Sequence, residues 1–190
     1  MFSNDHSETG GTPKTRPLPL DTLKLMRFIA AALLLVSALP ALAQDVKGAL
    51  VKHLKTSAEF TLKVAAAMPA ESYDFKLTPP QMSFAEQMIH IAQAQAFFMG
   101  YLTGEKASRA KPVSNSKADV TAFLKASFDK AIVSAEAATP EQLHTTYKTG
   151  EGMLMGWEVI MADIVHTAHH RASAEMYLRA KGITPPEYTF

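Results

Sequence analysis

Residues 157–181, WEVIMADIVHTAHHRASAEMYLRAK, are the stretch that decides the fold. The stretch contains no proline and no glycine, so it predicts one long helix that ends at Gly182. Residues four apart lie one above the other on a helix, which places His166 and His170 side by side. Two imidazoles at this spacing can bind one metal ion, although a solvated polar face is the alternative explanation of such a pair.

A third metal ligand must come from another part of the chain, and His90 is the best candidate. It lies in an apolar-rich helical pattern that begins at Ser83, where Ser83 and Glu86 have the spacing of a capping box. A single histidine in such a pattern is more often a core residue than a ligand. Three of the chain's seven histidines fall in one short run, and this concentration favours a shared site of His90 with His166 and His170.

The remaining sequence predicts an all-α protein, an antiparallel four-helix bundle with metal-binding side chains pointing inward. The first three long helices are expected over residues 46–68, 83–103 and 116–138, each with apolar residues at helical spacing. Thr139-Pro140-Glu141 predicts a short helix, and a loop through residues 148–152 leads into the last helix. No stretch alternates apolar and polar residues over a useful length, so no sheet is predicted.

The N-terminal part has the pattern of a secretory signal peptide. Lys24 and Arg27 precede an apolar run over residues 28–39, and Ala41-Leu42-Ala43 has the form of a cleavage site. We therefore divide the chain into an N-terminal extension with signal peptide, residues 1–43, and one helical-bundle domain, residues 44–190. The run is short for a membrane span, so no stable anchor is expected after cleavage, and the protein is expected to be periplasmic or secreted. Met26 is an alternative translation start, which would make residues 1–25 no part of the protein.

Composition excludes several functional classes. The chain has 19 Lys and Arg against 18 Asp and Glu, and this balance gives no case for nucleic-acid binding. The absence of cysteine removes thiol nucleophiles, thiolate metal ligands and a lipoprotein anchor. Histidine and carboxylate side chains remain as candidate ligands.

Three motifs together resemble the DinB-like superfamily, also called DinB/YfiT-like metalloenzymes. They are Tyr73-Asp74-Phe75-Lys76-Leu77-Thr78-Pro79, residues 83–92, and His166-Thr167-Ala168-His169-His170-Arg171 followed by residues 177–186. Their order and spacing carry the resemblance, which covers about residues 46–188. It implies a four-helix bundle in which a histidine triad binds a divalent metal.

Carried over position by position, the triad of the resemblance is His90, His166 and His170, the same three residues that the spacing selects. The family's usual Arg-Gly-Gln after the last histidine is here Arg171-Ala172-Ser173. Characterised relatives include enzymes that transfer low-molecular-weight thiols to electrophiles, so the resemblance implies a small-molecule substrate, with such a thiol among the candidates. A homodimer is a further expectation, and zinc and nickel are the first candidates for the ion.

Two functional classes stay open from the sequence: a metal-dependent transferase or hydrolase, and a non-catalytic bundle whose ion only joins two helices. The candidate catalytic residues are Glu86, Asp163 and Arg171. Glu86 could act as a base or only cap its helix, and Asp163 could orient a histidine or lie in solvent. His169 is assigned a supporting or structural role. The site is expected to be open, at the bottom of a cleft whose wall includes aromatic residues, namely Tyr101 or Phe97, Trp157 and Tyr73.

Overall fold

The computed structural model describes residues 20–107, 109–150 and 152–188, and the chain divides into two units, residues 1–39 and 40–190. Residues 1–19 of the predicted extension lie outside the described part. Over residues 30–45, which include the predicted cleavage site after Ala43, only the helical backbone is described. Within the described residues, no helix combines the length and the apolar character that crossing a membrane requires.

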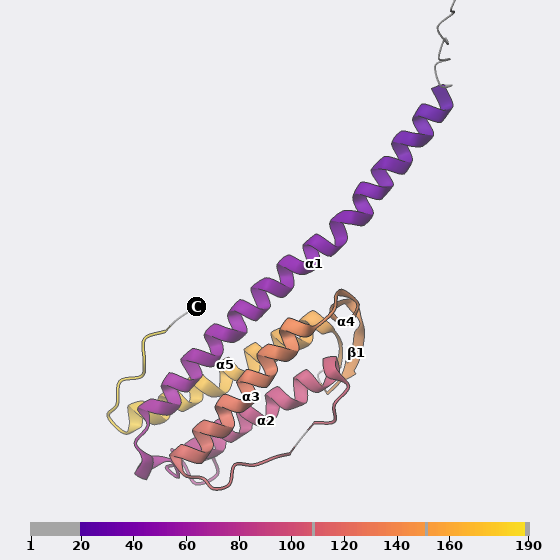
Figure 1. Ribbon diagram of the computed structural model, residues 1–190. Helices are drawn as coiled ribbons and strands as arrows, with labels where there is room; N and C mark the ends of the chain where they lie inside the picture. Colours follow the sequence, from indigo (N-terminus) through magenta and orange to yellow (C-terminus); the bar gives the residue numbers. More distant parts are fainter. Residues whose placement is uncertain (1–19, 108, 151, 189–190) are drawn as a thin grey trace, which may run out of the picture. The chain divides into compact units, whose positions relative to one another are not determined.

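The second unit is a bundle of four long helices, to which α1 contributes its part from residue 40 on, and this confirms the predicted all-α four-helix fold (Figure 1). The helices are α1 (Leu20–Ala67), α2 (Phe84–Thr103), α3 (Lys117–Ala137) and α5 (Gly156–Ala180). Two short helices, η1 (Ala70–Ser72) and α4 (Pro140–His144), lie in the connections. The helix expected over residues 46–68 is therefore the last part of α1, which begins much earlier than predicted.

The long connection over residues 104–116 decides the helix directions. It carries the chain back along the bundle, so α2 and α3 run in the same direction (Figure 1). Lys47 Nζ donates to Ala138 O while Lys117 Nζ donates to Met68 O, so α1 and α3 are antiparallel. Since α2 is also antiparallel to α5, the bundle combines antiparallel and parallel helix pairs.

Local sequence signals set the helix ends as predicted. Glu86 N donates to Ser83 Oγ and Ser83 N donates to Glu86 Oε2, which completes the capping box at the start of α2. Ser116 caps α3 through the backbone N–H of Asp119. Gly182 adopts a left-handed φ of 73° after α5, a conformation in which glycine avoids the usual side-chain strain.

The core is built from the apolar stripes of the helices. The predicted stripe of α2 is buried throughout, and the linker aromatics Tyr73 and Phe75 pack against the same core. Tyr73 is 1% exposed, and its hydroxyl donates to Ala65 O at 2.8 Å. The stripe of α2 consists of Phe84, Met88, Ile91, Phe98 and Leu102.

The prediction of no sheet is wrong, because a short antiparallel hairpin precedes α5. Its strands are β1 (Thr146–Thr149) and β2 (Gly152–Met155), and Tyr147 pairs with Leu154. Four residues per strand are too few to give a recognisable alternation. Tyr147 and Leu154 are half-buried and pack on the core, which gives the hairpin its apolar face.

Candidate metal centre

The three predicted ligands come together where α2 and α5 pack in antiparallel directions. The ring centroid of His90 lies 5.0 Å from that of His166 and 4.3 Å from that of His170. The centroids of His166 and His170, both on α5, are 4.6 Å apart. One ligand nitrogen from each residue lies within 4.8 Å of the other two. Among the described residues, this is the one group of three or more histidine, cysteine or acidic residues close enough to hold a metal ion.

The spacing of the nitrogens suits a single first-row metal ion. His90 Nε2 and His166 Nε2 are 3.2 Å apart. Zinc–imidazole bonds of about 2.0–2.1 Å in a tetrahedral arrangement place two ligand nitrogens about 3.3 Å apart. The same separation also permits a hydrogen bond between the two rings when one of them is protonated at Nε2. The geometry is therefore that of three residues that could hold a metal ion.

The surroundings favour neutral imidazoles, the form that binds metals. All three histidines are half-buried. Burial lowers the pKa of His90. Burial, followed by the neighbouring charges of His90, His166 and His169, lowers the pKa of His170 to about 4. A ring that resists protonation keeps its lone pair for an ion at neutral pH.

Gln87 is a site residue that the sequence analysis missed. Its Oε1 lies 2.7 Å from His170 Nδ1. An amide oxygen can only accept, so His170 carries its proton on Nδ1 and leaves Nε2 available as the ligand atom. Gln87 is 8% exposed and lies one turn before His90 on α2. A polar residue at that spacing, among the apolar residues of the helix, was the signal that could have identified it.

Asp163 lies in the core, so the interpretation of a solvated side chain is wrong. It is 0% exposed, and neither carboxylate oxygen has a hydrogen-bond partner among the described residues. Burial raises its pKa to about 7. Thr167, one turn further along α5, is also fully buried, and its hydroxyl has no partner in the described part of the chain.

The other two candidate catalytic residues are held by contacts of their own. Glu86 caps α2 and lies 3.2 Å from Lys76 Nζ, and the Ser83 backbone N–H together with Lys76 lowers its pKa. Arg171 is 8% exposed and donates through Nη1 to Ser57 Oγ on α1 at 2.9 Å. Its guanidinium thus connects α5 to α1.

An open cleft of about 450 Å³ reaches the metal centre through His90. Polar side chains dominate its wall, and the loop over residues 104–116 contributes to it through Lys111 and Asn115. Glu86 lines the cleft beside His90. The lining residues include Lys76, Gln81, Glu86, His90, Gln93, Lys111 and Asn115.

The aromatic residues expected in the cleft wall lie elsewhere. Phe97 and Tyr101 pack edge-to-face, with ring centroids 5.3 Å apart, and Tyr73 is enclosed in the core. Trp157 Nε1 donates to Met155 Sδ. Phe98 is the residue that contacts the site, with its ring centroid 5.7 Å from that of His166.

His169 is exposed, with its ring edge-on to His170 at 5.0 Å. It is not a member of the three-residue group. It faces solvent, which was the alternative to a supporting or structural role, and its charge contributes to the lowered pKa of His170.

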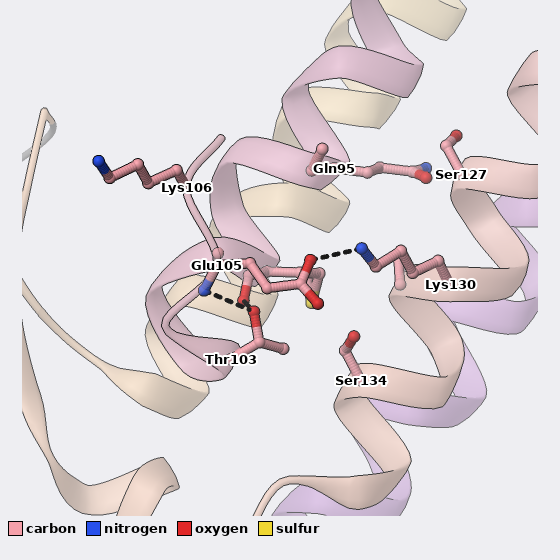
Figure 2. A pocket seen from close by; sticks show the side chains of 11 residues that line it. Gln95, Thr103, Glu105, Lys106, Ser127, Lys130 and Ser134 are labelled. Carbon is pink, nitrogen blue, oxygen red and sulfur yellow. Dashed lines mark hydrogen bonds and ion pairs between the residues drawn. The ribbon is translucent and has the colours of Figure 1, made fainter. Parts of the chain in front are cut away.

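A separate small cavity of about 60 Å³ lies between α2 and α3 (Figure 2). Gln95 extends from α2 toward Ser127 of α3, and both of its amide atoms lack a hydrogen-bond partner among the described residues (Figure 2). An ion pair between Lys130 and Glu105 closes one side. None of the triad histidines lines this cavity, so it is separate from the metal centre.

Comparisons with known proteins agree with this architecture. The sequence model of the DinB family matches residues 42–190. A crystal structure of a DinB-like protein from Bacillus subtilis is similar, with 21% identity, a TM-score of 0.63, and coverage of 73% of this chain and 95% of that one. A DinB-like protein from Bacillus cereus gives 20% identity, a TM-score of 0.64, and coverage of 74% and 95%. Among curated proteins, none matches the chain.

The buried carboxyl of Asp163 makes stability depend on pH. The unfolded chain releases this proton near pH 3.8, whereas the folded protein keeps it to about pH 7. The unfolded state therefore binds fewer protons at this group, and the contribution of Asp163 to the free energy of unfolding of the metal-free protein falls as pH rises from 4 to 7. Between these pH values, the change in the Asp163 contribution to the free energy of unfolding is at most on the order of 4 kcal/mol. Asp163→Asn removes this contribution, so its stability relative to wild type rises with pH.

Urea unfolding in chelator at several pH values measures this difference. Asp129→Asn is the matched control, since Asp129 is exposed and paired with Lys125, and its curve should run parallel to that of wild type. Parallel curves for Asp163→Asn and wild type would show that the Asp163 carboxyl does not titrate in this range.

Proposed function

The chain belongs to the DinB family, and on that premise we propose that it is a metal-dependent enzyme whose ion is held by His90, His166 and His170. The observation that carries the proposal is the convergence of three half-buried imidazoles beside an open cleft. Three protein ligands are typical of catalytic ions, because they leave a coordination position for water or substrate. Zinc and nickel are the first candidates, since both accept imidazole ligands.

Each protein group has a defined part in this proposal. Gln87 holds the His170 proton on Nδ1 and so directs Nε2 toward the centre. Phe98 packs against the ring of His166 and gives the site an apolar neighbour on that side. When bound, the metal lowers the pKa of a coordinated water or thiol, or polarises a carbonyl oxygen. The cleft beside His90 gives a small molecule access to the ion.

Transfer of a low-molecular-weight thiol is the reaction that the surroundings support best. A bound ion can activate water as well as a thiol, but hydrolysis gains further from a base that takes the proton of the water, and the candidates are poorly suited to this role. Glu86 accepts from Ser83 N and has a lowered pKa, while Asp163 is enclosed in the core. A thiolate is itself the nucleophile, so a thiol that loses its proton on the ion needs no separate base. A metal-dependent hydrolase is the second enzymatic candidate.

The non-catalytic alternative is a stress-associated bundle in which the ion only joins α2 to α5. A structural ion is normally enclosed by four protein ligands, and its removal mainly lowers stability. The polar cleft at His90 favours the open, catalytic arrangement.

We propose that the protein acts outside the cytoplasm, with the first 43 residues removed. The support is the basic residues, apolar run and Ala-Leu-Ala ending at residues 41–43. Mass spectrometry of exported protein should give a chain that begins at Gln44. A chain that retains residues 28–39 would indicate an anchored protein instead.

The metal-binding prediction follows from the three ligands and from Gln87. His90→Ala, His166→Ala and His170→Ala should each abolish stoichiometric metal binding. Gln87→Met should weaken affinity by about 10–100-fold, because His170 loses the acceptor that orients its ring. Titration calorimetry with zinc or nickel, on protein without a histidine tag, measures both effects.

Two control variants separate these effects from damage to the fold. His169→Ala removes an exposed neighbouring imidazole and should keep the ion. Gln93→Met changes a second glutamine of α2, whose amide donates to Ala110 O, and should leave affinity within about threefold of wild type. Loss of the metal in His169→Ala but not in His170→Ala would contradict the assigned triad.

An open site should accept a thiol directly. Protein loaded with cobalt should develop a sulfur-to-metal charge-transfer band when a small thiol such as 2-mercaptoethanol is added. The methyl thioether of the same compound, which cannot form a thiolate, should leave the spectrum unchanged. A spectrum unaffected by thiol, azide or any other small ligand would favour the enclosed structural ion.

A further inference from the structure

A cavity of about 310 Å³ lies between α1 and α5, and none of the three triad histidines lines it. This volume falls at the small end of the range of about 300–1,000 Å³ typical of small-molecule sites. Most of the wall is apolar, and Met161 and Val165 are 43% and 60% exposed at its open side. The apolar wall consists mainly of Leu50, Met161, Ile164, Val165 and Ala168.

Arg171 gives this cavity a positive charge at a buried position. Its side chain lines the cavity and is 8% exposed. Nη1 donates to Ser57 Oγ at 2.9 Å and to Thr61 Oγ1 at 3.4 Å, and the guanidinium lies 4.5 Å from the Phe60 ring centroid. These partners are neutral. Within residues 20–188, as far as the structure describes them, no carboxylate forms an ion pair with Arg171.

The guanidinium has no ion-pair partner among the described residues, and the charge of Glu175, one turn further along α5, offsets only part of the cost of its burial. Buried charges cost several kcal/mol unless they are paired and fully hydrogen-bonded. Among the described residues, only Nη1 of Arg171 makes hydrogen bonds. Nε and Nη2 are not among the buried atoms that lack a partner, so both stay accessible from the cavity side. The N–H groups of Nε and Nη2 therefore remain for a planar acceptor, which a carboxylate matches with two parallel hydrogen bonds.

We propose that this cavity binds a monocarboxylate with a short aliphatic chain. The carboxylate accepts from Arg171 at the inner end, and the aliphatic chain lies against Leu50, Ile164 and Val165. The lining also includes the polar side chains of His53, Thr56 and Ser57, but Arg171 is the one arginine or lysine in it, which suits a ligand with a single negative charge. The site is separate from the metal centre and does not depend on the proposed enzymatic function.

Titration calorimetry with octanoate tests the charge and the aliphatic chain separately. Octanoate should bind at least tenfold more tightly than octan-1-ol, which lacks the charge, and tenfold more tightly than acetate, which lacks the chain. Octylammonium, with the opposite charge, should not bind. Equal binding of octanoate and octylammonium, or no binding of octanoate at millimolar concentration, would overturn the proposal.

Variants locate the site. Arg171→Gln should weaken octanoate binding at least tenfold, and Ala168→Phe should do so by filling the cavity without changing its charge. Met176→Phe is the matched control, because Met176 is 56% exposed on α5 outside the cavity, and it should bind octanoate as wild type does. Unchanged octanoate binding in folded Ala168→Phe would contradict the assignment.

A measurement on the unaltered protein covers the case in which the variants do not fold. Nuclear Overhauser contacts should connect the octanoate methyl group to the Val165 and Ile164 methyl groups. If octanoate instead shows contacts only to other parts of the protein, and none to Val165 or Ile164, it binds elsewhere and the proposal is overturned. Zinc titration of the same samples reports on the metal centre independently, so failure of one site is distinguishable from failure of the other.

Discussion

The register in which α2 packs against α5 is the constraint on which the metal centre depends. It sets His90 opposite His166 and His170, and it sets Gln87 opposite His170. A slip of one helical turn would displace the rings by about 5.4 Å, further than a shared ion can tolerate. The register is held outside the centre, by buried residues along both helices and by the hydrogen bond from Tyr177 Oη to Met82 O. The site is thus a consequence of core packing at the two ends of the helix pair.

The interior of the bundle also contains polar groups that oppose folding. Gln95, Asp163 and Thr167 are buried with polar side-chain atoms that have no partner in the described residues. Each such group costs about 1–3 kcal/mol compared with a hydrogen-bonded one. Two of the three lie on α5, the helix that carries two of the ligands. Buried polar groups without partners are expected near functional sites, where function outweighs stability. The positions of Asp163 and Thr167 on the helix that carries two ligands fit that expectation.

The sequence predicted the helices and the grouping of the three histidines because both follow from short-range periodicity. A spacing of four residues identified His166 and His170, and a capping box placed His90 on the helix beginning after Ser83. The hairpin was missed because its strands are four residues long, and Gln87 was missed because its partner lies 83 positions away. Parallel pairing of α2 with α3 was also outside the reach of periodicity, since a local pattern cannot say where a long loop returns the chain.

Consecutive residues of α5 serve two different helices, which explains how one segment can carry two sites. His170 and Arg171 are separated by about 100° around the helix axis. The imidazole therefore faces α2, where it meets Gln87, while the guanidinium faces α1, where it meets Ser57. Because adjacent residues diverge in this way, a substitution at position 171 alters the contact with α1 directly and the metal centre only through movement of the shared backbone. The Arg171 side chain is accordingly better placed to connect helices and to receive an anion than to take part in chemistry at the ion.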